Sequence, residues 1–437
     1  MLSMALSLWL CKNELGKSEN HTFAPQTTQF MIKMYLLTAV ICLLSFLCMG
    51  QDAETPYKLT VSGFVRADAL FDSRQAVEAR EGFLLFYAKK PQYDKEGKDI
   101  NEKPSFNQYA MCTRLTAKVT GPDVLGAKAF AVIEGDFTGA SNAENNSMRL
   151  RHAYISMQWD KTRLIMGQYW HPMDLPEMIP GVLGLNTGAP FHSFSRQPQI
   201  RVDHKLGAFN LVAVATSQRD YVNSGPDGNS SIYLRNSIVP NLHGQLHFKK
   251  TGIFIGAAVD YKMLTPRLVT DSNYISNESV NCLSYTLFGN TAFNGLSIKA
   301  QYTLNRALND HLMMGGFGIT ETDPITNRHT YTPLNYHAVW LNVSYTKTNW
   351  QPSLFAGYTL KADTETPFTG AVYARGADIE YVYRIAPMLT FVQKKFNFCA
   401  ELEYTAAAYE TDETLLISLK DKETGILRVN LAAVYNF

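Results

Sequence analysis

Polar and apolar side chains alternate with a period of two along most of this chain. In residues 296–305 the polar positions are Ser297, Lys299, Gln301 and Thr303, and the apolar positions between them are Leu296, Ile298, Ala300 and Tyr302. Successive side chains of a β-strand point to opposite faces, so such a segment has one polar and one apolar face. The helical period of 3.6 residues is hard to find anywhere. The pattern therefore predicts an all-β protein.

Sixteen such runs are expected after residue 60. Their approximate spans are 61–71, 109–120, 127–137, 148–159, 163–170, 198–205, 209–216, 241–248, 253–262, 280–293, 296–305, 336–347, 350–360, 378–393, 396–409 and 426–437. The run 148–159 is the least regular, because Arg149 and Arg151 share parity with Ile155 and Met157. Its polar face is therefore either ambiguous or interrupted by a β-bulge.

The connections between these runs alternate in length. Seven are short, such as Asn294-Gly295, a favourable two-residue hairpin turn, and the other eight are long and polar, such as 72–108 and 217–240. Alternate turns of an antiparallel meander lie at opposite ends. The alternation predicts a transmembrane up-and-down β-barrel with short periplasmic turns and long extracellular loops, because a soluble β-sandwich would mix loop lengths at both ends. Closing the sheet into a barrel also gives every backbone N–H and C=O group in the lipid a hydrogen-bond partner on a neighbouring strand.

Aromatic residues lie near the ends of several expected strands, on the apolar parity. They include Tyr261, Tyr302, Tyr345, Tyr358, Tyr404, Tyr435 and Phe437. This placement is typical of the aromatic girdles at the two membrane interfaces. Ordinary cross-strand packing is the alternative explanation.

The first fifty residues are not expected to belong to the barrel. Residues 31–50 have a basic residue, an apolar stretch and small residues before a polar start, which predicts a signal peptide cleaved after Gly50. A lipoprotein signal at Cys48 and a retained membrane anchor are the alternatives. Residues 1–30 are interpreted as a start site placed too far upstream. The predicted domain is then a single outer-membrane barrel, 51–437.

Composition narrows the possible partners. The chain has 40 basic and 39 acidic residues, so no nucleic-acid partner is expected. Three cysteines remain after residue 50, namely Cys112, Cys282 and Cys399, and they are treated as packing residues. No phosphate-binding loop, HExxH motif or CxxC motif is present, so neither a cofactor nor a metal is expected.

A barrel of about sixteen strands is wide enough for a water-filled channel. The expected lumen wall carries basic residues on early strands, namely Arg66, Arg114, Lys118, Arg149, Arg151 and Arg201. The long loop 171–197 carries the acids Asp174 and Glu177 together with apolar residues that an external loop has little reason to expose. The loop is therefore expected to fold inward as a constriction and to set its acids against the basic wall.

A simpler alternative is that these arginines are lumenal charges paired with acids on the wall. The acids in question are Asp68, Glu134, Asp136, Asp203, Glu401 and Glu403. Such pairs would only keep the wall hydrated.

Four segments resemble the DcaP-like trimeric porins of Gram-negative outer membranes. They are GFVRADALFDS (63–73), MRLRHAYISM (148–157), GQYW (167–170) and RQPQIR (196–201), and the ending VYNF (434–437) is similar too. The resemblance implies a sixteen-stranded trimer that passes small, mainly anionic, organic solutes. The terminal Phe437 resembles the sorting signal read by the barrel-assembly machinery. Such porins often carry a periplasmic coiled-coil extension, for which residues 51–60 leave no room.

The first functional hypothesis is a passive outer-membrane porin, not an enzyme, for small hydrophilic solutes that are anionic or zwitterionic. Its expected partners are outer-membrane lipid, the solutes, the assembly machinery and two further copies in a homotrimer. The second hypothesis is a barrel enzyme of the lipase or protease kind, using a Ser or Asp with His152 near the rim. The third is a soluble secreted β-sandwich that binds glycans.

Overall fold

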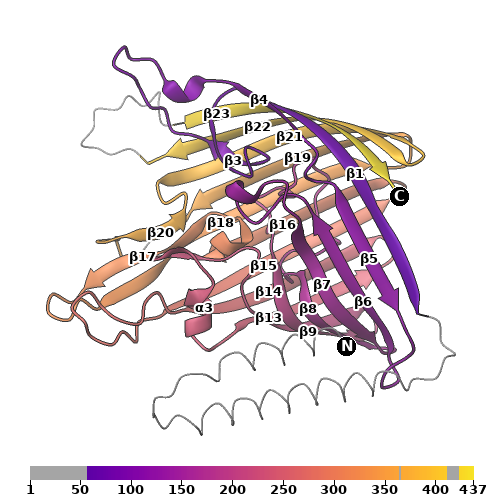
Figure 1. Cartoon of the computed structure of the whole chain (residues 1–437), viewed down its shortest axis with the longest axis horizontal. Coiled ribbons are helices and arrows are strands. Elements are labelled where there is room, and N and C mark those ends of the chain that lie inside the picture. The colour runs from indigo at the N-terminus through magenta and orange to yellow at the C-terminus, as the bar shows by residue number, and fades with distance from the viewer. Residues whose placement is uncertain (1–56, 364–365, 411–422) are drawn as a thin grey trace, which may run out of the picture. The chain divides into compact units, whose positions relative to one another are not determined.

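The computed structural model describes residues 57–363, 366–410 and 423–437. The predicted upstream segment 1–30 and the predicted signal peptide 31–50 lie outside the described residues. Sixteen strands form one closed antiparallel barrel (Figure 1). They are β1 (Lys58–Asp72), β5 (Arg114–Thr120), β6 (Lys128–Asp136), β7 (Arg149–Gln158), β8 (Thr162–Trp170), β9 (Arg196–Leu206), β10 (Phe209–Thr216), β13 (Asn241–Lys250), β14 (Ile253–Leu264), β15 (Val280–Phe293), β16 (Leu296–Arg306), β18 (His329–Tyr345), β19 (Trp350–Lys361), β21 (Ile379–Gln393), β22 (Phe396–Tyr409) and β23 (Glu423–Asn436).

The barrel closes where its first and last strands meet. Strand β1 pairs with β23 from Phe64 opposite Asn436 to Asp72 opposite Arg428, and it pairs with β5 on its other side. In Figure 1 these are the indigo and yellow strands that lie side by side. Each of the sixteen expected runs overlaps one barrel strand, so the predicted fold class is confirmed. The β-sandwich hypothesis is wrong, because one sheet closes on itself.

Tight turns join alternate pairs of strands at one end. Asn294 and Gly295, between β15 and β16, have φ of 49° and 89°, the left-handed values that a tight hairpin turn requires. Glycine reaches such a φ without steric cost, and asparagine tolerates it better than most residues. The connections at the other end are long, so the predicted alternation is confirmed.

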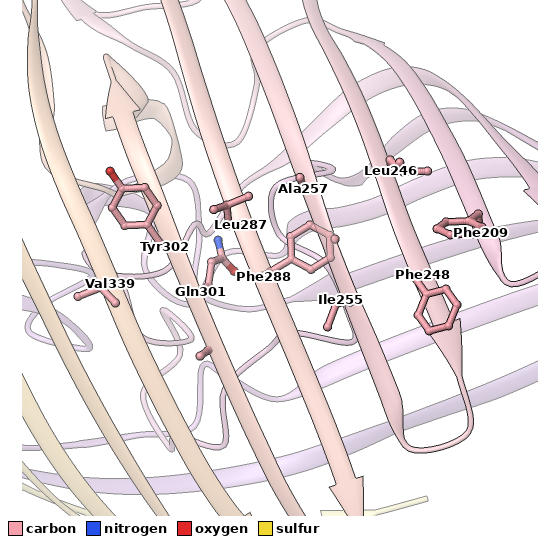
Figure 2. A pocket seen from close by; sticks show the side chains of 12 residues that line it. Phe209, Leu246, Phe248, Ile255, Ala257, Leu287, Phe288, Gln301, Tyr302 and Val339 are labelled. Atoms are coloured by element: carbon pink, nitrogen blue, oxygen red, sulfur yellow. The ribbon is translucent and has the colours of Figure 1, made fainter.

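The alternating pattern becomes two faces of different polarity. On β16, Tyr302 is 38% exposed, whereas its neighbours Gln301 and Thr303 are 3% and 1% exposed. Figure 2 shows side chains of neighbouring strands that line a hollow, among them Leu246, Ile255, Ala257, Leu287 and Val339. The volume of this hollow is about 590 Å³. These exposed apolar side chains form the face that lies in lipid, as expected for a multi-pass outer-membrane protein.

Strand β7 contains the predicted bulge. Its pairing with β6 shifts between Glu134, opposite His152, and Gly135, opposite Leu150, so that Arg151 has no partner in the register. The extra residue lets Arg149, Arg151 and His152 all turn into the barrel, where each is at most 6% exposed. Leu150 remains 48% exposed on the outer face.

Shorter elements occupy the long connections. They are β2 (Ala76–Ala79), β3 (Leu84–Ala88), η1 (Ile100–Glu102), β4 (Ser105–Tyr109), η2 (Asn142–Glu144), β11 (Ser224–Gly225), β12 (Gly228–Asn229), α3 (Ile232–Asn236), η3 (Leu308–His311), β17 (Gly315–Thr322) and β20 (Val372–Arg375). Strands β17 and β20 pair with each other, and β17 also pairs with the first part of β18. Among the described residues, no helix is both long and apolar enough to cross a membrane.

The hairpin β2–β3 packs inside the barrel. All five residues of β3, Leu84 to Ala88, are at most 5% exposed. The guanidinium group of Arg384, on β21, donates hydrogen bonds to the carbonyl oxygens of Leu85 and Phe86, both at 3.1 Å. This hairpin and residues of loop 171–197 share one apolar cluster with wall residues such as Trp340 and Phe355. Part of the interior is therefore filled with packed side chains.

Candidate functional site: the lumen of the barrel

Arg66 joins the barrel wall to loop 171–197. Its Nε donates to Asp68 Oδ1 at 2.8 Å, two positions along β1 on the same inward face. Its Nη2 donates to the backbone oxygen of Leu183 at 2.8 Å. The guanidinium group thus binds one wall carboxylate and one loop carbonyl at once.

Arg149 and Arg151 share one carboxylate on the neighbouring strand. Arg149 Nη2 and Arg151 Nη1 each lie 2.9 Å from Asp136 Oδ2, and Asp136 is fully buried. Arg151 Nε also lies 2.8 Å from Glu134 Oε1. The bulge in β7 produces this arrangement, because it places both arginines on the face that carries the acids of β6.

The other basic residues predicted for the wall have different surroundings. Arg201 Nη2 lies 2.8 Å from Asp203 Oδ1. Arg114 Nε is 3.7 Å from Glu134 Oε1, and its guanidinium carbon lies 5.1 Å from the Phe64 ring centroid. Lys118 is exposed and lies over the Phe130 ring, with Nζ 4.2 Å from the centroid. Within the described residues it is the one of the six without an ion pair.

Most of the predicted wall arginines are therefore compensated by neighbouring acids. Four of the six acids named as alternative partners do pair with them: Asp68, Glu134, Asp136 and Asp203. Glu403 pairs instead with Arg384 at 3.2 Å, and Glu401 accepts a hydrogen bond from Leu183 N at 2.8 Å. A guanidinium beside a carboxylate presents little net charge to a passing solute.

Loop 171–197 lies against side chains of strands from much of the barrel circumference. Its backbone oxygens accept hydrogen bonds at Pro172 from Gln245, at Glu177 from Asn290, at Ile179 from Lys299, at Gly181 from Ser353, at Leu183 from Arg66 and at Ala189 from Arg384. These donors belong to β13, β15, β16, β19, β1 and β21. Backbone groups that would otherwise need water thus find partners on the wall.

Apolar side chains anchor the same loop. Leu175, Met178 and Leu183 are at most 5% exposed, although they lie in a connecting segment. Leu175 and Met178 pack in the cluster that contains Trp340 and Phe355 of the wall. Burying a large aliphatic side chain contributes about 1.5–3 kcal/mol, so these residues hold the loop inside the barrel.

The two loop acids have different environments. Asp174 is fully buried, with His192 Nε2 3.9 Å from its Oδ1 and Ser195 N 3.4 Å from its Oδ2. Burial raises the pKa of Asp174 to about 8, so its carboxyl group is mostly neutral at pH 7. Burial thus disfavours the negative charge expected for Asp174, and its charge in the pore stays a prediction. The Glu177 side chain is 40% exposed and lies 3.2 Å from Lys249 Nζ.

A cavity of about 480 Å³ lies between the loop and the strand ends near the tight turns. Its lining includes Arg163, Tyr169, Glu177, Arg201 and Lys249. Arg163 and Arg201 both bind Asp203, at 3.0 and 2.8 Å. This is water-accessible space on the side of the loop that faces the short turns.

The barrel-enzyme hypothesis depended on His152. Its Nε2 lies 3.7 Å from Glu134 Oε1, and its ring packs against Tyr154, Tyr169 and Trp170. No hydroxyl or carboxylate nucleophile hydrogen-bonds to it among the residues that the structure describes. Nor does the described part of the chain contain a group of three or more His, Cys, Asp or Glu residues arranged to hold a metal ion.

Sequence reasoning missed the inward packing of hairpin β2–β3, although a signal was present. The run Phe83 to Ala88 is continuously apolar within a long polar connection. Apolar residues within a long connection are also the feature that predicts inward folding for loop 171–197. Two arginines outside the barrel strands, Arg80 and Arg375, were also missed, because neither lies on an alternating segment.

A closed barrel of sixteen strands, with an apolar outer face, a charged inner face and a long loop packed inside, has the fold of the outer-membrane porins. It is similar to the outer-membrane channel DcaP of Acinetobacter baumannii at 18% identity, over 87% of this chain and 97% of that chain, with a TM-score of 0.63. It is also similar to the trimer form of OmpT, an outer-membrane protein of Vibrio cholerae, at 9% identity (87% and 99% covered, TM-score 0.51). Salmonella typhi OmpF in complex with daunomycin is similar at 10% identity (87% and 98% covered, TM-score 0.51).

No protein-family model matches the chain, and no curated protein matches its sequence. The predicted resemblance to DcaP-like porins is thus confirmed for the fold.

Proposed function

We propose that this protein is a passive diffusion channel of the outer membrane for small hydrophilic solutes. The observation that carries the proposal is the inward face itself. It is lined by charged and amide side chains on strand after strand, while the outer face of the same strands is apolar. An inner surface of this kind needs water, and a barrel of about sixteen strands is wide enough to hold it.

Loop 171–197 is the proposed constriction. Its contacts with six strands support a position across the bore rather than above it. Hairpin β2–β3 narrows the same space from the side of the long loops. The solutes are therefore limited in size by two inserted segments.

The solutes are proposed to be anionic or zwitterionic. The resemblance to DcaP-like porins supports this preference. So does the local excess of arginine on β5, β7 and β9 over the acids that pair with it. Five of the six predicted wall residues pair with acids, but some share one carboxylate, so the preference depends on the positive charge that remains.

Planar bilayers test the proposal directly. The refolded protein, checked by its heat-modifiable migration, should give stepwise ion conductance. The barrel boiled before insertion is the control and should give none. A folded barrel that inserts and does not conduct would contradict the channel function while leaving the fold intact.

We also propose a homotrimer assembled with help from the barrel-assembly machinery. The porin fold supports the first point, and the aromatic ending at Phe437 supports the second. Chemical cross-linking of the protein in outer-membrane vesicles should give a ladder that ends at three copies. A ladder that stops at one copy would remove the trimer from the proposal.

A further inference from the structure

Two arginines in the interior have no acidic partner. Arg80 lies in the turn between β2 and β3, and Arg375 is the last residue of β20. Within the described residues, neither guanidinium group makes a hydrogen bond or an ion pair. The Nε atoms of both are buried without a partner, and the Arg80 residue is only 5% exposed. The surroundings of Arg80 and Arg375 therefore differ from those of the five predicted wall arginines, each of which pairs with a carboxylate.

Aromatic rings hold both side chains in place. The guanidinium carbon of Arg80 lies 5.8 Å from the centroid of the Tyr221 ring. That of Arg375 lies 4.2 Å from the centroid of Phe86, in strand β3. An aromatic face attracts a cation but leaves the N–H edges of the guanidinium group free to donate.

Tyr221 connects Arg80 to the charged wall. Its hydroxyl oxygen lies 3.3 Å from Arg149 Nη1. Arg80 and Arg149 thus contact one tyrosine side chain, although they come from two separate parts of the chain. Arg375 lies against the same hairpin as Arg80, because its guanidinium carbon packs on the ring of Phe86 in strand β3.

The local charge is unbalanced as a result. Four wall arginines share three carboxylates through ion pairs: Arg114, Arg149, Arg151 and Arg196 with Glu134, Asp136 and Asp220. This network has a net charge of +1, to which the unpaired Arg80 and Arg375 at hairpin β2–β3 add positive charge. A net positive charge in a partly dry, protein-lined space attracts anions more strongly than the same charge in bulk water.

We propose that Arg80 and Arg375, which both lie at hairpin β2–β3, are the residues that select anionic solutes. The inference rests on the proposed channel function and deepens it, because it places the selective groups on two segments outside the barrel wall. The ligand chemistry is a carboxylate, which a guanidinium fork binds through two parallel hydrogen bonds.

Charge-removing variants test the inference. Arg80→Gln, Arg375→Gln and the double variant are compared with wild type by the reversal potential in a KCl gradient. The double variant should lose at least about threefold in the anion-to-cation permeability ratio, because two uncompensated charges are removed from the field along the path. The matched control is Arg267→Gln, which removes an extracellular arginine already paired with Glu278 at 3.0 Å and should leave the ratio unchanged.

Charge-conserving variants test the recognition of the carboxylate. Arg80→Lys with Arg375→Lys keeps both charges but removes the fork. Chloride preference should persist, while the permeability of benzoate relative to chloride should fall. Equal benzoate permeability in the arginine and lysine channels would overturn the carboxylate site.

The two proposals fail in different ways. A wild-type barrel that folds and does not conduct contradicts the channel function and this inference together. A conducting channel whose anion preference survives in the glutamine double variant contradicts only this inference. Heat-modifiable migration of each variant shows that its barrel has folded.

Discussion

Ser193 Oγ lies 2.7 Å from His311 Nδ1, and both side chains are fully buried. Ser193 belongs to loop 171–197, and His311 ends the short helix η3 in the connection between β16 and β18. The backbone reinforces this contact, because Phe194 N donates to His311 O at 2.9 Å. The two connections are therefore attached to each other as well as to the wall.

Because buried histidines lie where loop 171–197 contacts η3, we predict that acid weakens this contact. The ring of His171 lies 4.3 Å from that of His311, centroid to centroid, and Lys262 Nζ lies 2.5 Å from Asp310 Oδ1. Burial, reinforced by the charge of Lys262, lowers the pKa of His311 to about 3. The neutral imidazole is thus the form that the folded protein binds. Its contribution to stability is fully present above pH 6.5 and is lost as the pH falls from 6.5 towards 3.

The expected result is a weaker attachment of the loop in acid. Each pH unit below about 6.5 costs roughly 1.4 kcal/mol for every histidine that must stay neutral, and His192 is under the same constraint because burial lowers its pKa to about 3. Single-channel recordings should therefore show more frequent conductance changes at pH 4.5 than at pH 7.

The variant His311→Gln cannot titrate at this position. The pH at which conductance changes become frequent should therefore be lower in this variant than in wild type. His337→Gln, at an outward-facing histidine bonded to Tyr302 at 2.8 Å, is the control. The same transition midpoint in wild type and His311→Gln would contradict the assignment.

Asp136 is predicted to be the acid whose loss destabilises the barrel most. It accepts from Arg149 and Arg151 at 2.9 Å each and from the Thr138 hydroxyl at 2.8 Å, and it is fully buried. Asp136→Asn keeps the shape but leaves buried guanidinium charge uncompensated, which costs about 3–5 kcal/mol. The measurement is the urea midpoint of unfolding in detergent. Asp123→Asn, at the exposed pair with Lys128 (3.8 Å), should leave this midpoint unchanged. Equal midpoints for the two variants would mean that the Asp136 pairs are not essential.

Phe437 is predicted to act during assembly rather than in the finished barrel. Its N and O pair with Gly63 O and N at 3.1 and 3.3 Å, and its side chain is 41% exposed. Phe437→Ala keeps these backbone bonds, so refolding into detergent should proceed as in wild type. Assembly in cells should fall several-fold if the barrel-assembly machinery reads the ring. Phe398→Ala, another outward aromatic residue at 50% exposure, is the control. If Phe437→Ala reduced refolding in detergent as much as assembly in cells, the ring would act in folding rather than in recognition by the assembly machinery.

The sixteen strands could be predicted because the information for each is local. A strand between lipid and water must alternate, so Tyr302 and Gln301 reveal their faces without reference to any other strand. The alternation of short and long connections is local in the same way. Even the bulge in β7 was visible, as the conflict between the parity of Arg149 and that of Ile155.

The interior was harder to predict because it depends on contacts between distant segments. The pairing of Arg151 with Glu134 requires the register of β6 against β7, and parity alone leaves it open. The burial of Asp174 depends on Ser195 and His192, whose positions follow from how the whole loop folds. Arg80 approaches Tyr221, and Arg375 approaches Phe86, only because separate long connections meet, which no spacing in the sequence encodes.

A disulfide placed between loop and wall tests the proposed constriction most directly. A β-carbon added at Gly181 would lie 3.6 Å from the Cβ of Ser353, on β19, and Cβ atoms of a disulfide are about 3.5–4.5 Å apart. The double variant Gly181→Cys with Ser353→Cys, made with Cys112, Cys282 and Cys399 replaced by serine, should therefore oxidise readily. Its single-channel conductance should match wild type before and after reduction, because the bond fixes the loop where it already lies. The control pairs Gly181→Cys with a cysteine at Thr330, far from the loop near the start of β18, and should stay reduced. A loop that extends outside the barrel would leave both pairs reduced, and the constriction would have to be sought in hairpin β2–β3 instead.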